Sequence, residues 1–334
     1  MGKISTYATL FRIPGLGGLA IPPVIAALTM GVFDIFQLIL LFLIGAFSVI
    51  YGFILNDYVD MEVDKLSNEL KERPLVSGKI HPSMVIWLCF SCIILTFLGF
   101  FILFFDKTIT QYRFLSVLCI IVAWLLGSIY DQFGKKIVGS DFFVSLSVAF
   151  VFLFGAFAYG FPTLYTWIIF VLTFNQLLHM NAVEGGIKDA DHDYLMGVKN
   201  IASKAGVKVI GKKLIIPTRF KVFSLGIRLF SIVLLFVPFI FYHENYVDWQ
   251  IVLLTVTSAG VVFFTIRLLS LKTFDRKMIR KYISVLSFLR FSLVPLMLIS
   301  VIGMLPSLIL IIFPIVWYIC FTPLTGAKLF QPRM

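Results

Sequence analysis

The sequence predicts an all-α protein, a polytopic bundle of nine or ten transmembrane helices around a central cavity. Of its 334 residues, 60% are hydrophobic and only 13% are charged, which is roughly half the charged fraction of a typical soluble domain. Apolar runs of about 20 residues, the length that crosses a bilayer, recur along the whole chain. Because a helix satisfies its own backbone polar groups in lipid, these runs are expected to be helical.

Ten apolar runs are the expected spans, at about 14–31, 35–55, 83–105, 113–130, 141–160, 163–183, 222–242, 249–269, 282–303 and 306–322. The last two runs are separated only around Pro306, so nine spans remain possible. Of the loops between the runs, 184–221 is the one candidate for a separate soluble domain. Residues 1–334 are therefore expected to form one integral-membrane domain, and the N-terminus shows no cleavable signal pattern.

The distribution of basic residues predicts the orientation. Lys107 and Arg113 are the only bases in loops that follow odd-numbered runs, although the chain carries a net charge of +11. Such an imbalance follows the positive-inside rule, so topology rather than nucleic-acid binding accounts for the charge. The N-terminus and the active-site loops are expected to be cytoplasmic, the loops being about 56–82, 131–140, 184–221 and 270–281.

The four cysteines do not indicate redox or zinc chemistry. Cys89 and Cys92 form a C-x-x-C pattern, but both lie inside an apolar run with no second pair nearby. We interpret them as small residues of the core or of the lipid-facing surface.

The first candidate site follows the second run, in the stretch 56–64. Relative to Asn56, a helix places Asp60 at about 40°, Asp64 at about 80° and Asp57 at about 100°. Four oxygen-bearing side chains then share one face at the end of a membrane helix. Carboxylate and amide oxygens favour a hard cation such as Mg²⁺. A solvated acidic helix end is the alternative interpretation, although acidic groups are less favourable at a C-terminus.

Basic residues on the same expected side of the membrane are candidates for binding an anion. Arg12 precedes the first run, and Arg73 belongs to a polar loop that also contains Pro74 and Ser77-Gly78. The fourth run ends in Tyr130, followed by Lys135 and Lys136. Each base could instead be a topology anchor whose side chain extends to the interface.

The second candidate site follows the sixth run. Asp189 and Asp193 are four residues apart and share a helix face, whereas Asp191 would point away. Lys188 stands beside them, and Gly185-Gly186 could let the backbone bend. Of the 17 acidic residues, six lie in 57–72 and four in 184–193. Such concentration at the ends of membrane helices is typical of function rather than surface decoration.

Two carboxylate clusters flanked by bases suit metal ions and a diphosphate. Mg²⁺ is usually held by a few carboxylates together with substrate phosphates. Metals and bases neutralise the charge of a departing pyrophosphate. Loss of pyrophosphate from an allylic diphosphate would leave a carbocation, which aromatic faces can shelter. The residues thus predict a metal–diphosphate site in a lipid-facing cavity.

The motifs resemble those of the UbiA superfamily of intramembrane prenyltransferases. Asn56-Asp57-x-x-Asp60-x-x-x-Asp64 is similar to its N-D-x-x-D-x-x-x-D motif, and Arg73-Pro74-Leu75-x-Ser77-Gly78 to its R-P-x-x-S-G element. Asp189-x-x-x-Asp193 resembles its second aspartate motif. The resemblance extends from Arg12 to about Gly206. It departs at Tyr130-Asp131-Gln132-Phe133-Gly134, where the family often has Tyr-Ser-x-Pro-Pro.

The resemblance implies a role for each candidate. Asn56 and Asp60 would bind one Mg²⁺ ion, with Asp57 and Asp64 beside them, and Asp189 and Asp193 would bind a second. The diphosphate would contact Arg12, Arg73, Lys135, Lys136 and Lys188, with the choice between Lys135 and Lys136 open. Tyr130 would face the developing allylic cation.

The resemblance also implies the reaction, transfer of a prenyl chain from a polyprenyl diphosphate to a lipophilic acceptor. The R-P-L-x-S-G element favours an aromatic acceptor such as a hydroxybenzoate. The alternative acceptor is a glyceryl phosphate, as in archaeal ether-lipid members. An ion-coupled transporter is the alternative from another class, but its acidic residues would lie near mid-span. A cytidine-lipid phosphotransferase is disfavoured because the sequence lacks its Asp-Gly-x-x-Ala-Arg signature. The sequence leaves chain length and oligomeric state open.

Overall fold

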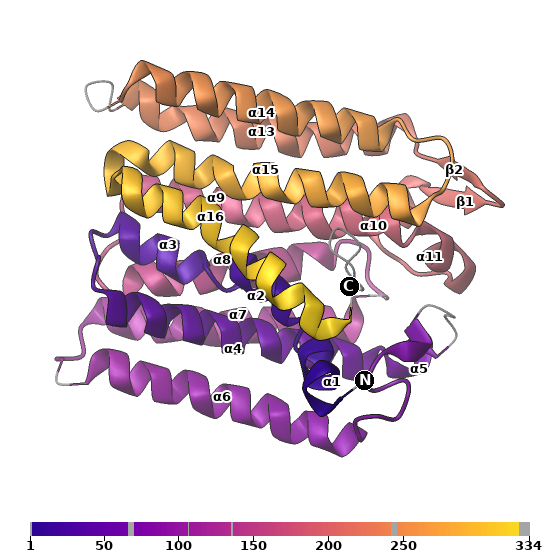
Figure 1. Cartoon of the computed structure of the whole chain (residues 1–334), viewed down its shortest axis with the longest axis horizontal. Helices are drawn as coiled ribbons and strands as arrows, with labels where there is room; N and C mark the ends of the chain where they lie inside the picture. The colour runs from indigo at the N-terminus through magenta and orange to yellow at the C-terminus, as the bar shows by residue number, and fades with distance from the viewer. Residues whose placement is uncertain (1, 66–69, 106, 135, 242–245, 327–334) are drawn as a thin grey trace. The chain divides into compact units, whose positions relative to one another are not determined.

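A computed structural model describes residues 2–65, 70–105, 107–134, 136–241 and 246–326. Helices make up nearly all of this part of the chain, together with one two-stranded antiparallel sheet (Figure 1). The all-α membrane class predicted from the sequence is confirmed. By contact clustering the chain divides into two compact units. The expectation of a single membrane domain stays a prediction.

Within the described residues, nine segments are long and apolar enough to cross a membrane. An apolar helix of 17 residues, α8 (Asp141–Phe157), is shorter than these. It coincides with the expected fifth span but ends at Phe157 instead of continuing to 160. The last two expected runs, which the sequence left as one span or two, are separate long segments at Arg276–Ile302 and Met304–Thr325, and the count of nine among the described residues arises because α8 is shorter. The protein is a multi-pass integral membrane protein.

Unit 1 contains residues 1–132, 147–166 and 314–334. Its elements are α1 (Lys3–Leu10), α2 (Ile13–Leu19), α3 (Pro22–Thr29), α4 (Ile35–Val59), α5 (Met61–Asp64), the 3₁₀ turn η1 (Leu70–Glu72), α6 (Pro82–Phe104), most of α7 (Gln111–Phe133), the second part of α8 and the end of α16 (Met304–Phe321) with η4 (Thr322–Thr325).

The first span of unit 1 differs from the expected continuous run. It covers Lys3–Thr29 and consists of α1, α2 and α3 rather than one helix. The break between α1 and α2 occurs at Arg12, which has a left-handed backbone (φ 48°). Prolines near the starts of α2 and α3 favour new helices at these points, because proline suits the first turn of a helix.

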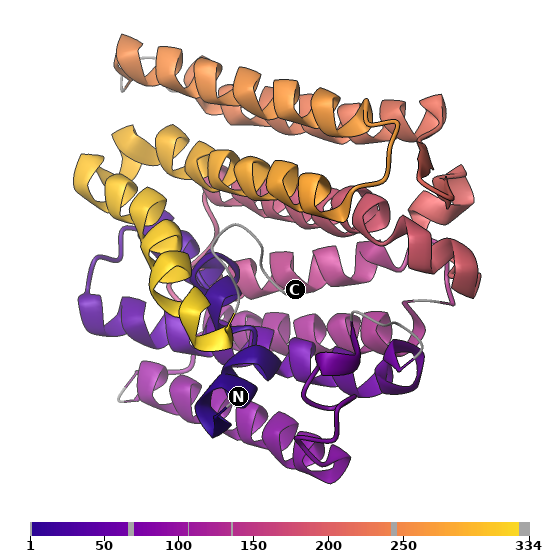
Figure 2. The same ribbon diagram turned by 45° about the vertical axis from the view of Figure 1, so that its right-hand side comes forward.

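Close backbone packing holds the helices of unit 1 together. Figures 1 and 2 both show α4 beside α6, and a Cβ at Gly99 of α6 would lie 2.7 Å from Ile44 of α4. A Cβ at Gly155 of α8 would lie 2.3 Å from the carbonyl oxygen of Pro23 in α3. Small residues at such contacts let membrane helices approach closely, which favours dispersion contacts.

Unit 2 contains residues 133–146 and 167–313. Its elements include most of α9 (Leu164–Leu178), the π-helix η2 (His179–Gly185), α10 (Gly186–Lys188), α11 (Ala190–Met196), α12 (Ile201–Ala205), β1 (Lys208–Ile210), β2 (Lys213–Ile215), α13 (Thr218–Phe241), α14 (Asp248–Leu269) and α15 (Arg276–Ile302). Figure 1 shows α11 and the β1–β2 hairpin gathered at one end of the long helices of this unit.

Polar side chains contribute to helix packing in unit 2. Gln250 of α14 is buried, and its Nε2 donates to the carbonyl oxygens of Leu296 (2.8 Å) and Met297 (3.2 Å) in α15. Hydrogen bonds between membrane helices stabilise their association, because lipid offers no competing partner.

Candidate functional site

The first cluster lies where α4 ends and α5 begins. Asp60 caps α4, and its backbone N–H donates to the carbonyl of Asn56 at 2.9 Å. The N–H of Asp64 donates to the carbonyl of Asp60 at 2.8 Å. These two i→i−4 bonds continue the helical path through the motif. Asn56, Asp60 and Asp64 therefore follow one another along one face, as the spacing predicts.

Two arginines bind the carboxylates of this cluster. Nη2 of Arg12 donates to Oδ1 of Asp57 at 2.7 Å. Nη1 of Arg73 contacts both Oδ1 of Asp57 (3.3 Å) and Oδ2 of Asp64 (2.5 Å). Asp57 and Asp64 are buried, and charged hydrogen bonds of this kind are stronger than neutral ones. The expected bases and carboxylates of unit 1 are thus brought together.

The backbone of Arg12 is unusual. It is the one non-glycine residue with positive φ in the described ranges, a conformation that costs an ordinary side chain free energy. The turn at Arg12 directs its guanidinium over the ring of Phe53, at 4.6 Å from the centroid, and onto Asp57. The cation–π contact and the ion pair offset this cost.

The loop after α5 holds Arg73 in place. The hydroxyl of Ser77 and its backbone N–H both bond to the carbonyl oxygen of Arg73, at 2.8 and 2.9 Å. Gly78 has φ 71°, which glycine adopts without strain, and the N–H of Ile80 donates to Pro74. The R-P-x-x-S-G element is therefore a turn that fixes the base of the Arg73 side chain.

Electrostatics keep Arg73 charged. Burial lowers the pKa of its guanidinium, but the negative charges of Asp57 and Asp64 raise that pKa by more. The net result is a pKa above the ordinary arginine value. Arg73 therefore keeps its positive charge beside Asp57 and Asp64.

The other residues predicted for this side of the site differ in how far they are buried. Tyr130 is half-buried near the end of α7, and Lys136 is exposed in the turn that follows. Lys135 lies outside the described residues. Sequence reasoning missed Asp131, which is buried at the end of α7 and interacts with Asn56. The departure from the family pattern immediately after Tyr130 could have drawn attention to Asp131.

The second cluster lies in unit 2, after a change of helix type. The π-helix η2 passes into α10, and Asp189 separates α10 from α11. The N–H of Asp193 donates to the carbonyl of Asp189 at 2.9 Å, so the two residues share a face as predicted. Nζ of Lys188 lies 3.5 Å from Oδ2 of the half-exposed Asp189. π-helical turns within helices are frequent at functional sites.

Two residues that sequence reasoning missed hold this cluster. Nδ2 of Asn200 donates to Oδ2 of Asp193 at 2.6 Å, while Asn200 also caps α12 in a reciprocal capping box. Nη2 of Arg276 donates to Oδ1 of Asp191 at 2.6 Å. Asp191, which the sequence ranked below its neighbours, is thus an anchor to α15. Arg276 is distant from the motif in the chain, and Asn200 lies seven residues after Asp193 beyond the end of α11, so helix spacing within the motif did not reveal either partner.

Gly186 has a packing role that differs from the expected bend. Its φ is −60° and its backbone is helical. A Cβ at this position would lie 2.4 Å from Cβ of Ala202. Glycine is required because α10 and α12 approach closely, which places Asn200 beside Asp193.

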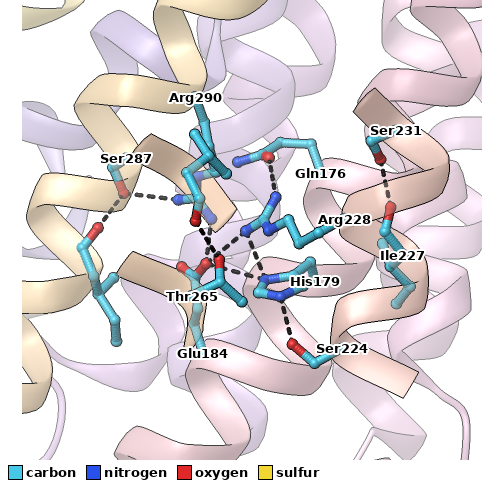
Figure 3. A network of polar contacts seen from close by, with 12 residues as sticks. Gln176, His179, Glu184, Ser224, Ile227, Arg228, Ser231, Thr265, Ser287 and Arg290 are labelled. Carbon is cyan, nitrogen blue, oxygen red and sulfur yellow. Dashed lines mark hydrogen bonds and ion pairs between the residues drawn. The ribbon is translucent and has the colours of Figure 1, made fainter. Parts of the chain in front are cut away.

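Figure 3 shows a buried ionic network around Glu184, which precedes the second cluster in the chain. Glu184 of η2 accepts from Nη2 of Arg228 in α13 at 2.9 Å and from Nη1 of Arg290 in α15. Arg228 also donates to Nδ1 of His179 at 2.7 Å and to Gln176 at 3.1 Å. Nδ1 of His179 also lies 3.1 Å from Oε1 of Glu184, and its Nε2 lies 2.9 Å from the hydroxyl of Ser224. The network ties η2 to α13 and α15.

The donor set of each cluster suits Mg²⁺. In the part of the chain that the structure describes, no three His, Cys, Asp or Glu side chains converge as a complete metal cage. Mg²⁺ does not require one, since it is usually held by one or two carboxylates with substrate phosphates and water. The oxygen atom Oδ2 of Asp131 is buried without a hydrogen-bond partner in the structure.

The sequence matches a known family profile over most of its length. A family profile described as "UbiA prenyltransferase family" matches residues 19–293. A digeranylgeranylglyceryl phosphate synthase of Korarchaeum cryptofilum is 29% identical over 222 residues, which cover 63% of this chain and 71% of that protein. The synthase of the same name from Methanocaldococcus jannaschii is 35% identical over 82 residues, or 24% of this chain and 28% of that protein.

Solved structures share the fold. One solved structure comes from work on the biosynthesis of digeranylgeranylglyceryl phosphate synthase in membranes. Its TM-score is 0.64 at 20% identity, and the match covers 90% of this chain and 99% of that chain. A UbiA homologue from Archaeoglobus fulgidus bound to DMAPP and Mg²⁺ has a TM-score of 0.61 at 16% identity, covering 89% and 99%. At these identities the likeness shows the fold alone.

The buried network predicts a large stability effect for Glu184→Gln. The substitution removes the negative charge and leaves two guanidiniums buried together, which should lower the free energy of unfolding by about 3–5 kcal/mol. Glu62→Gln is the matched control, because Glu62 forms an exposed ion pair with Lys65 that should contribute at most about 1 kcal/mol. Thermal unfolding in detergent measures both, and equal stability of the two variants would contradict the role given to the network.

Proposed function

The chain belongs to the UbiA prenyltransferase family, and on that premise we propose that it transfers a prenyl group from a polyprenyl diphosphate to a glyceryl phosphate lipid. The transferase class follows from the family match over residues 19–293. The observation that carries the substrate class is the pair of carboxylate motifs, each at the end of a membrane helix and each beside bases.

The relatives favour the glyceryl phosphate acceptor over the hydroxybenzoate that the sequence motifs favoured. Both curated relatives are named digeranylgeranylglyceryl phosphate synthase. Such a name describes ether-lipid chemistry, in which the acceptor is an alcohol. A hydroxybenzoate acceptor becomes the alternative, to be separated by experiment.

Each cluster is proposed to bind one Mg²⁺ ion. Asn56 and Asp60 provide oxygen ligands in unit 1, with Asp57 and Asp64 beside them, and Asp189 and Asp193 provide them in unit 2. Related A. fulgidus structures contain Mg²⁺ with DMAPP or GPP, which supports the choice of ion. Mg²⁺ bound there supplies positive charge that stabilises the departing pyrophosphate.

The basic residues are proposed to bind the diphosphate. Arg12 and Arg73 already face carboxylates, so they can contact phosphate oxygens while remaining oriented by Asp57. Lys188 has the equivalent position beside Asp189, and Lys135 and Lys136 follow Tyr130. All these groups neutralise charge that grows as the bond to carbon breaks.

The reaction then needs only displacement at the allylic carbon. Its bond to the diphosphate oxygen breaks, and pyrophosphate leaves with the electron pair. The acceptor hydroxyl oxygen forms the new bond to that carbon, and its proton passes to pyrophosphate or water. Tyr130 is proposed to face the transient cation with its ring. The N-terminus and both motifs are proposed to be cytoplasmic, as the basic loops indicate.

The acceptor is identified by competition. Purified protein in detergent receives geranylgeranyl diphosphate, Mg²⁺, and equimolar prenylglyceryl phosphate and 4-hydroxybenzoate, and mass spectrometry follows the products. We expect the diether phosphate to dominate by at least tenfold. A prenylated benzoate as the main product would establish the aromatic branch instead. Absence of product and of diphosphate binding for several chain lengths would favour a transporter.

The carboxylates are tested by Asp60→Ala and Asp189→Ala, one in each motif. Each substitution should reduce Mg²⁺-dependent pyrophosphate release at least 1000-fold, because it removes an oxygen ligand of the proposed ion. Cys89→Ser/Cys92→Ser serves as the control and should retain turnover, since both residues are packing residues of α6. Full activity in either aspartate variant would contradict the assignment, provided that both variants insert in the membrane normally.

A further inference from the structure

Asp131 carries a carboxylate whose surroundings require an explanation. It lies in α7, one residue after Tyr130, and is only 8% exposed. Its oxygen Oδ2 is buried and has no hydrogen-bond partner in the described structure. A buried carboxylate oxygen without a partner is costly, so such a group needs a ligand or a function.

Two contacts fix the position of Asp131 against the first cluster. One turn earlier in α7, the Ser128 hydroxyl bonds to the hydroxyl of Tyr51 in α4 at 2.9 Å. The ring of Tyr51 also packs against Trp124, with centroids 5.9 Å apart. These contacts set the register of α7 against α4, and the next turn brings Asp131 to Asn56.

The contact with Asn56 also orients that residue. Asp131 accepts a side-chain hydrogen bond from Asn56, and a carboxylate can accept only from the NH₂ of the amide. The carbonyl oxygen of the Asn56 amide is then directed away from Asp131. This oxygen is the atom with which Asn56 can bind a cation, so Asp131 selects the useful orientation of the amide.

The charges of the cluster point the same way. Asp131 lies within electrostatic range of Asp57, Asp60 and Arg12. With Asp64, four carboxylates are opposed by two guanidiniums, those of Arg12 and Arg73. The guanidiniums of Arg12 and Arg73 contact Asp57 and Asp64, whereas Oδ2 of Asp131 is buried without a hydrogen-bond partner.

We propose that Asp131 is a third protein ligand of the Mg²⁺ ion in the first cluster, with Asn56 and Asp60. One of its oxygens holds the Asn56 amide and the other, Oδ2, contacts the cation. Two carboxylates and one amide match the modest protein share that Mg²⁺ takes when phosphates and water complete its shell. This inference rests on the proposed function, because it assumes that the first cluster binds the ion.

The test is a Mn²⁺ titration followed by electron paramagnetic resonance, with a non-hydrolysable geranylgeranyl thiolodiphosphate present. Asp131→Asn keeps the shape and an acceptor for Asn56 but removes the charge. It should lower the affinity for one of the Mn²⁺ ions at least tenfold. Asp34→Asn is the matched control, because Asp34 caps the opposite end of α4 and asparagine caps equally well. It should bind Mn²⁺ like the wild type.

The inference would be overturned if the Mn²⁺ titrations of Asp131→Asn and wild type superimposed while Asp60→Asn lost one ion. The proposed function would then remain intact. Absence of Mn²⁺ binding by the wild type would instead refute the metal site of the proposed function.

A second variant covers a failure of Asp131→Asn to fold. Asp131→Cys replaces a hard ligand by a soft one, so Cd²⁺ should gain at least tenfold in affinity relative to Mn²⁺. The four native cysteines are present equally in the wild type, which serves as the reference. An unchanged Cd²⁺ to Mn²⁺ ratio would contradict direct contact between residue 131 and the ion, because a purely structural role would not alter metal preference.

Discussion

The ion pairs that Arg73 makes with Asp57 and Asp64 are the interaction on which the first cluster depends. Several carboxylates cannot remain charged at the end of a membrane helix without compensating cations. Arg73 supplies one such charge from a turn built by Ser77 and Gly78, and Arg12 supplies another from a strained backbone. The turn and the strained backbone thus hold both guanidiniums against the carboxylates of this cluster.

Unit 2 solves the corresponding problem with a different construction. The π-helix η2 carries Glu184, which two arginines from α13 and α15 bind inside the bundle. Beyond η2, Asp193 is held by Asn200 and Asp191 by Arg276. The aspartate motif is thus supported from elements that follow it in the chain. A change in any of these supports should affect the motif without touching a substrate.

Composition and spacing were sufficient for the membrane class, the boundaries of most spans and the family, because hydropathy and helix periodicity are local properties. Proximity of Arg12 and Arg73 to the first motif was expected as shared sidedness, and the structure gives it as direct contacts with Asp57. The supports from Arg276, Arg228 and Arg290 could not be predicted, since they depend on pairing between distant segments. The support from Asn200, seven residues after Asp193, depends on the turn before α12. The sequence does not predict the π-helical turn either, because its seven residues (His179–Gly185) have no distinctive pattern.

The central claim is that carboxylate-bound Mg²⁺ holds the diphosphate of the donor. Isothermal titration calorimetry with geranylgeranyl thiolodiphosphate, in Mg²⁺ and again in EDTA, tests it most directly. The account predicts binding at least 100-fold weaker in EDTA, because the carboxylates then repel the phosphates without an intervening cation. Equal affinity in both buffers would contradict it, since the arginines and lysines would then suffice to hold the diphosphate.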